Sequence, residues 1–179
     1  MTLGTKTVLF GFHQFLIHPI IVTIAWIRLY KSLPTFKEFI CICLHDIGYI
    51  GKNDIKGEEG DRHPELGARI ANRLLGPKYR DFILGHSTYY IYRHRVKRSK
   101  LLSADKFIFV NMSLTFFKIM TTLSGEFTYY RNQRNSRQVC DESESDKVWF
   151  DKIKKAARDK IEGTYYIDPS KLDVLNKSH

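Results

Sequence analysis

The sequence predicts an all-α protein, a bundle of about six to eight helices. Apolar residues recur at helical spacing in several long stretches, and no stretch shows a convincing alternation of polar and apolar residues as a strand does. Prolines, glycines and polar turns separate these stretches, as expected at helix ends. The 179 residues are 43% hydrophobic and 27% charged, which is ordinary for a single globular domain with one core.

The charge balance is less ordinary than the length. Lysine and arginine number 29 against 19 acidic residues, so the formal net charge is +10. This excess favours polyanionic partners, namely nucleotides, nucleic acid or an acidic membrane surface. A basic surface that serves only solubility is the alternative, and charge alone does not separate the two.

The three cysteines do not form a disulfide framework. Their number is odd, and Cys41 and Cys43 stand in an apolar helical stretch, far from Cys140. We interpret the first two as small buried core residues. This usage predicts a reducing, cytoplasmic compartment.

The first element is predicted as one long helix over residues 7–30, bent near His18 and Pro19 because proline removes a backbone donor. Its apolar positions wrap most of the way round, which is typical of a central helix. The run is long enough to cross a bilayer, but it contains His13 and His18, and such groups are rare in the middle of a membrane. We therefore predict a buried core helix and no membrane partner.

The second helix is predicted over residues 36–46, where Thr35 and Glu38 match a capping box. It ends in the adjacent pair His45 and Asp46. Burying an imidazole and a carboxylate is costly unless a partner compensates them. A divalent metal ion would satisfy both side chains. A capped histidine beside a salt-bridged aspartate would satisfy them as well.

Residues 48–61 are predicted to form a polar loop, because they contain four glycines and no apolar periodicity. A loop of this length in a compact domain is often a lid or a binding loop, and otherwise a solvated connector. Its acidic residues include Asp54, Glu58 and Glu59.

Further helices are predicted downstream. Pro64 and Glu65 favour the first turn of a helix that starts at His63, and Gly76 and Pro77 end it. Helical spacing then continues over residues 78–92, 101–110, 114–131 and 147–161. We assign residues 1–131 to one helical domain. Residues 132–179 are assigned to a flexible connector, a C-terminal amphipathic helix and a tail packed on the same domain.

The densest basic run, residues 93–100, follows three tyrosines. Cations beside aromatic rings can hold phosphates and stack a base. A solvated basic turn is the alternative.

Six side chains with metal-binding groups fall on successive predicted helices or helix ends, each in an apolar or capped context. They are His18, His45, Asp46, His63, His86 and Asp105. Any one histidine is explained by a core or capping role. Together, four histidines and two aspartates are enough for two metal ions, with Asp46 placed to bridge them.

The order of these residues resembles the HD-domain superfamily of metal-dependent phosphohydrolases over roughly residues 11–109. The match consists of His18, the His45-Asp46 doublet and Asp105, while His63 and His86 look like the added histidines of binuclear members. Gly48 and Tyr49 after the doublet are too short a match to place the chain in the HD-GYP subgroup.

The resemblance implies an HD-like helical bundle and two divalent ions, with Mn, Fe, Co, Zn and Mg not distinguished. His18, His45, Asp46 and Asp105 would hold the first ion, and Asp46, His63 and His86 the second. The implied reaction is hydrolysis of a nucleotide or a related small phosphate ester by a metal-bound hydroxide. The cations predicted to hold the remaining phosphates are Lys52, Arg62, Arg93, Lys97 and Lys106.

One departure concerns the acid and base of the reaction. Some nucleotidase members carry an acidic residue soon after the doublet, whereas residues 47–50 are uncharged in this chain. Besides Asp46 itself, the catalytic candidates are therefore Asp54, Glu58 and Glu59 on the glycine-rich loop.

Two other functions fit the same residues. The six-ligand order also resembles that of the di-iron oxygenases built on the HD fold. A basic module that binds a nucleotide or nucleic acid around a structural metal site is the non-enzymatic alternative.

Overall fold

The computed structural model describes residues 1–132 and 144–164, and all regular structure in these residues is helical. The all-α prediction is therefore confirmed. In chain order the elements are α1 (Leu3–Phe10), α2 (Ile17–Tyr30), α3 (Phe36–Leu44), the 3-10 turn η1 (Ile47–Tyr49), α4 (Gly57–Asp61), α5 (Pro64–Leu75), α6 (Pro77–Leu84), α7 (Thr88–Arg93), α8 (Lys100–Asn111), α9 (Leu114–Thr122), α10 (Glu126–Asn132) and α11 (Asp146–Glu162).

The helices are more numerous than the six to eight predicted, because several expected elements are divided. The expected helix over 78–92 is two helices, α6 and α7, and the one over 114–131 is likewise α9 and α10. The segment 48–61 is not a structureless loop, since it contains most of η1 and all of α4.

The long first helix is also two helices, and the break comes earlier than predicted. The chain leaves the helical path at Gly11, and residues 11–16 form a turn in which the amide of Phe15 donates to the carbonyl of Val8 at 3.0 Å. Pro19 lies in the first turn of α2, where a missing N–H leaves no helix bond unmade. The expected bend at His18 and Pro19 is therefore absent.

Helix α2 is not wrapped on all sides, as the central-helix prediction required. Val22, Ala25 and Trp26 are buried on its inner face. The opposite face exposes four isoleucines at helical spacing, each at least 38% exposed: Ile17, Ile20, Ile24 and Ile27. Among the helices of residues 1–132 and 144–164, none has the length and hydrophobicity that a membrane crossing requires.

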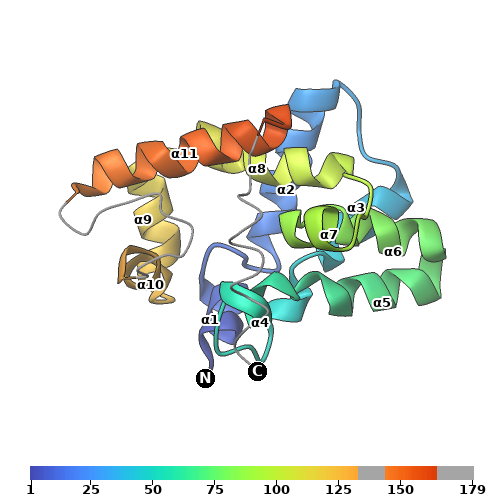
Figure 1. Ribbon diagram of the computed structural model, residues 1–179, viewed down its shortest axis with the longest axis horizontal. Coiled ribbons are helices and arrows are strands. Elements are labelled where there is room, and N and C mark those ends of the chain that lie inside the picture. The colour runs from blue at the N-terminus through green and yellow to red at the C-terminus, as the bar shows by residue number, and fades with distance from the viewer. Residues whose placement is uncertain (133–143, 165–179) are drawn as a thin grey trace.

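The largest core cluster lies where α2, α8, α9 and α11 meet. Trp26, Leu101, Phe117, Trp149 and Phe150 are each no more than 4% exposed within it. Figure 1 shows α11 running along α8, with α2 behind them. The helix α11 thus packs on the same core as α2, although residues 133–143 of the predicted connector and the tail after 164 lie outside the described ranges.

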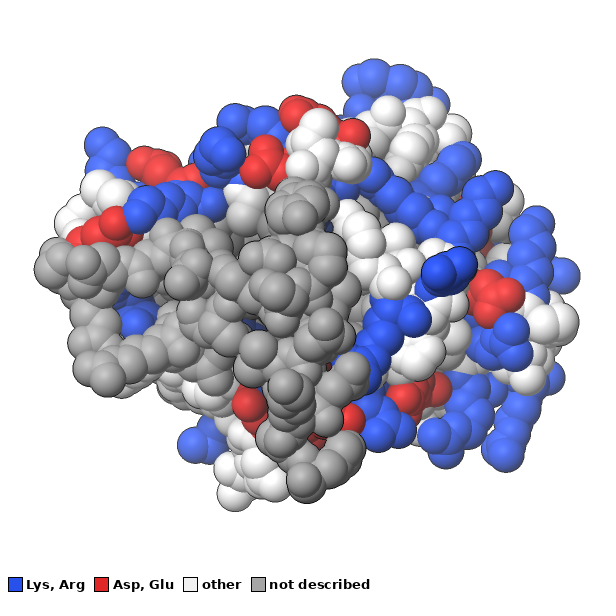
Figure 2. Space-filling model, in the orientation of Figure 1, with Lys and Arg blue, Asp and Glu red and all other residues white. Residues whose placement is uncertain are grey.

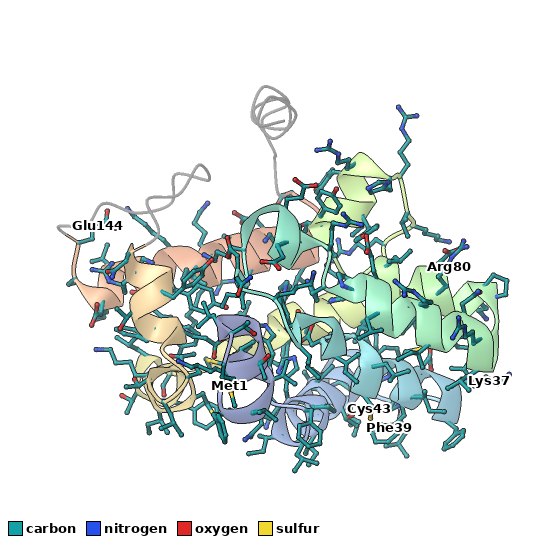
Figure 3. The ribbon with its side chains drawn as sticks, turned by 90° about the horizontal axis from the view of Figure 1, so that it is seen from below. Met1, Lys37, Phe39, Cys43, Arg80 and Glu144 are labelled. Carbon is teal, nitrogen blue, oxygen red and sulfur yellow. The ribbon has the colours of Figure 1, made fainter. Side chains whose placement is uncertain are left out.

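A second, smaller core joins α3 to α5 and α6, which lie side by side (Figure 1). Cys41 is fully buried there, as predicted. Cys43 is exposed, so its assignment to the core is wrong. Two residues further along the helix, it lies on the outer side of α3 with Phe39 (Figure 3). Cys140 falls outside the described residues.

Candidate metal centre

Six side chains from five places in the fold converge on one buried point. His18 comes from the first turn of α2, Asp105 from the middle of α8, and His45 and Asp46 from the end of α3. His63 precedes α5, and His86 lies between α6 and α7. Each of the six is at most 9% exposed. The structure therefore brings together all six predicted ligands.

Asp46 stands between two groups of ligand atoms and directs one oxygen to each. Its Oδ2 lies 3.2 Å from His18 Nε2 and 3.0 Å from His45 Nε2. Its Oδ1 lies 3.3 Å from His63 Nε2 and 3.6 Å from His86 Nε2. Asp105 joins the first group through Oδ1, 3.3 Å from His18 Nε2.

Three of the histidines are held in one tautomer by backbone carbonyls. The Nδ1 atoms of His45, His63 and His86 lie 2.7, 2.6 and 2.5 Å from the carbonyl oxygen three residues earlier. A carbonyl only accepts, so each ring carries a proton on Nδ1, and a neutral ring presents a bare Nε2 to the centre. Metal-binding histidines are usually oriented in this way.

The centre leaves polar atoms unsatisfied in a manner that a cation would correct. His18 Nε2, His45 Nε2 and Asp46 Oδ2 are buried without a hydrogen-bond partner, although they lie close together. Buried polar groups rarely stay unpaired. Atoms that share an ion at about 2.0–2.2 Å lie roughly 3–4 Å from one another, which is the spacing observed. These buried His and Asp groups can therefore hold a metal ion, and they form two sets around Asp46.

Among the predicted substrate-binding cations, Lys106 contacts a candidate metal ligand. Its Nζ lies 2.6 Å from Asp105 Oδ2, which leaves Oδ1 of the same carboxylate facing His18. Burial alone would lower the pKa of Lys106, but Asp105 outweighs it and raises the pKa. The ammonium group therefore orients a candidate ligand in this structure.

The other four predicted cations are engaged elsewhere or exposed. Arg62 donates to Glu65 at 2.8 Å, and the exposed Arg93 lies over the ring of Tyr89. Lys97 is exposed, and Lys52 accepts from the amide of Gly4 through its backbone carbonyl. Figure 2 shows Lys and Arg side chains spread over the part of the surface formed by α5, α6 and α7. None of these contacts is to a candidate metal ligand.

The three loop carboxylates are likewise not brought to the centre by their hydrogen bonds. Glu59 accepts from the amides of Asn53 and Asp54, at 3.1 and 3.0 Å. Asp54 accepts from the amide of Lys56 at 2.7 Å and from the hydroxyl of Tyr129. Glu58 is exposed. Asp54 and Glu59 hold the loop in shape, and the structure supplies no proton-transfer contact for them.

A small cavity opens beside the first group of ligands. Its lining consists of Val8, His13, Phe15, His18, Pro19, Ile42, Cys43, His45, Asp46 and Ile47. None of the five predicted cations lines it. The approach to this side of the centre is therefore mostly apolar, apart from the imidazoles and Asp46.

The sequence interpretation missed two residues near the centre, the partly buried His13 and the fully buried Glu126. His13 Nε2 lies 4.0 Å from Asp46 Oδ2, and Glu126 Oε1 lies 3.6 Å from His13 Nδ1. One local signal was present: Gly11 is a poor helix residue, and a helix that stops there releases His13 toward His18. Glu126 offered no local signal, because it lies far along the chain from His13.

Comparison with known proteins finds no matching family model, no matching curated protein and no matching solved structure. The function of this chain is therefore inferred from its own residues.

Proposed function

We propose that this protein belongs to the HD-domain superfamily and is a metal-dependent phosphohydrolase that acts on a nucleotide or a related small phosphate ester. The observation that carries the proposal is Asp46, one buried carboxylate that faces two separate groups of histidines. A carboxylate in this position can bridge two metal ions. The net charge of +10 supports a phosphorylated substrate, because it favours anions near the surface.

Bound ions would lower the pKa of a bridging water and polarise a phosphoryl oxygen. The protein's own contribution is orientation. Backbone carbonyls fix the rings of His45, His63 and His86, and Lys106 fixes one oxygen of Asp105. Burial of the ligands keeps bulk water away, which strengthens every charge interaction in the site.

The test is activity after reconstitution with defined metals. Purified protein is stripped with a chelator and loaded separately with Mn²⁺, Fe²⁺, Co²⁺, Zn²⁺ or Mg²⁺. A panel of nucleotides and phosphate esters is then assayed for release of phosphate, pyrophosphate and nucleoside. We expect release with at least one metal and none from the stripped protein. No release from any metal-loaded sample contradicts the proposal.

One observation favours an oxygenase as the second candidate. The group of Asp46, His63 and His86 is a two-histidine, one-carboxylate set, which is typical of non-haem iron sites that leave coordination positions open for oxygen. Two equivalents of iron together with substrate-dependent oxygen consumption, and no phosphate release, would select this alternative.

A further inference from the structure

A fifth histidine, the partly buried His13, faces the centre in addition to the four histidines and two aspartates that were predicted as ligands. The side chain of His13 is 12% exposed, and its ring lies 5.5 Å from the ring of His18 and 4.8 Å from the ring of Tyr49. It lines the same cavity as His18, His45 and Asp46. Its Nε2 is 4.0 Å from Asp46 Oδ2, too far for a hydrogen bond.

The opposite side of the His13 ring is anchored by a chain of buried groups. Nδ1 lies 2.9 Å from Thr7 Oγ1, and this oxygen lies 2.5 Å from Glu126 Oε1. The other oxygen of Glu126 accepts from the amide of Phe12 and the hydroxyl of Ser124, each at 2.7 Å. Glu126 is 0% exposed. A fully buried carboxylate is costly, so this anchor needs an explanation beyond packing.

The anchor determines which nitrogen of His13 carries the proton. Three donors point at the two oxygens of Glu126, namely the hydroxyl of Thr7, the amide of Phe12 and the hydroxyl of Ser124, so the carboxylate only accepts. The single hydroxyl proton of Thr7 therefore goes to Glu126. The Thr7 oxygen then accepts from Nδ1–H of His13. A neutral His13 ring is left with a bare Nε2 on the side of Asp46 and the cavity.

This is the arrangement of the predicted ligands His45, His63 and His86, with a hydroxyl and a carboxylate in place of a backbone carbonyl. Hydrogen-bonded partners of this kind are the usual support of a metal-binding histidine. The turn that carries His13 is shaped for it. A side chain at Gly11 would overlap Oε2 of Glu126, so only glycine lets the turn approach this carboxylate.

We propose that His13 is a seventh metal ligand, which joins the first group of ligands from the side of the cavity, and that Thr7 and Glu126 are the positioning residues that fix its tautomer. The 4.0 Å between His13 Nε2 and Asp46 Oδ2 is short enough for one ion to bind both atoms at about 2.0–2.1 Å. His13 does not belong to the four ligand atoms that lie within 4.8 Å of one another in the metal-free structure, so its ring has to move toward them when an ion binds. The inference rests on the proposed function only in requiring a metal centre. It does not depend on which reaction the centre performs.

A third imidazole in the first group has a consequence for metal choice. Imidazole nitrogen suits iron, cobalt, nickel and zinc, whereas magnesium prefers oxygen ligands. A first group of three histidines and two aspartates therefore selects against Mg²⁺, which the sequence did not distinguish from the other ions.

The test is Co²⁺ binding to chelator-stripped full-length protein, followed by visible absorption and without any substrate. His13→Ala is compared with His94→Ala, because His94 is exposed and stacks on Tyr90 outside the centre. We expect His13→Ala to weaken binding of one Co²⁺ by about 10- to 100-fold and to change its absorption spectrum. His94→Ala should bind and absorb as the wild type does. Thr7→Val, which keeps the ring but removes its acceptor, should give a smaller loss.

His13→Gln fills the same space without an imidazole and guards against a folding defect in the alanine variant, with circular dichroism as the check. If the folded variants of His13 keep the affinity and spectrum of the wild type, His13 is not a ligand. If the wild type itself binds no Co²⁺, both the metal centre and the proposed function fail. If it binds Co²⁺ but releases no phosphate, only the proposed reaction fails.

Discussion

The two ligand groups around Asp46 share a carboxylate but differ in charge. The first group sets two carboxylates against His18 and His45, and the ammonium of Lys106 lies beside it. The second group sets the same Asp46 alone against His63 and His86. The balance of acidic and basic groups is therefore different on the two sides of one side chain.

The difference appears in the pKa values of the metal-free protein. Burial would lower the pKa of His18, but Asp105 and Asp46 outweigh it and raise the pKa to about 9. Burial dominates at His63, where the pKa falls to about 4 although Asp46 partly opposes the shift. Burial likewise lowers the pKa of His86. An ion in the first group must displace a proton from His18, whereas the second group is already neutral and ready to bind.

Removal of the shared carboxylate should have the largest effect. Asp46→Ala takes an oxygen ligand from both groups, so we expect neither ion to survive metal loading and desalting, with affinity down by more than about 100-fold. Elemental analysis measures the bound metal. Asp81→Ala, at an exposed aspartate paired with Arg80, is the matched control and should retain all of it. One full equivalent of metal in Asp46→Ala would show that the carboxylate is not shared.

Removal of a ligand from only one group should cost one ion rather than two. Asp105→Asn affects the first group, and His86→Gln affects the second. We expect each variant to bind about half of the wild-type metal under the same loading. Loss of both ions in either variant would mean that the two groups bind their ions as one unit. The difference in charge between the groups would then not affect how much metal each group binds.

The six candidate ligands could be predicted because most of them stand at a position with a local sequence signal. His45 and Asp46 end an apolar helix, His63 precedes a proline that starts one, and Asp105 interrupts an apolar face. Chain order and helical spacing were therefore enough to predict most of the residues of the candidate centre.

The rest depended on contacts that local patterns do not contain. Apolar residues on both sides of Gly11 concealed the break that releases His13. The hydroxyl of Thr7 donates to Glu126, which lies 119 residues further along the chain. The sequence around Glu126 predicts only an aromatic-rich helix. An apolar run also does not show which of its sides stays exposed, as the isoleucines of α2 demonstrate.

The contrast between the groups should also shape the pH dependence of the stability of the metal-free protein. An unfolded histidine has a pKa near 6.5. His63 titrates near 4 in the folded state, so the unfolded state binds more protons, and stability is lost as the pH falls from 6.5 toward 4. His18 has the opposite sign. Its contribution is fully present below pH 6.5 and is lost as the pH rises through about 9.

The free energy of unfolding of the metal-free protein should therefore be highest near pH 6.5. At pH 5 the protonation of His63 in the unfolded state should lower this free energy by about 2 kcal/mol. Urea unfolding at pH 5, 6.5 and 9 measures it. His63→Gln should reduce the acid loss, and His18→Gln the alkaline loss. The pKa values of Asp46 and Asp105 are lowered, so both carboxylates titrate below pH 5. They therefore do not change the loss of stability between pH 6.5 and 5 or between pH 6.5 and 9. If His63→Gln loses as much stability at pH 5 as the wild type, the second group is not held neutral, and the contrast between the two groups is wrong.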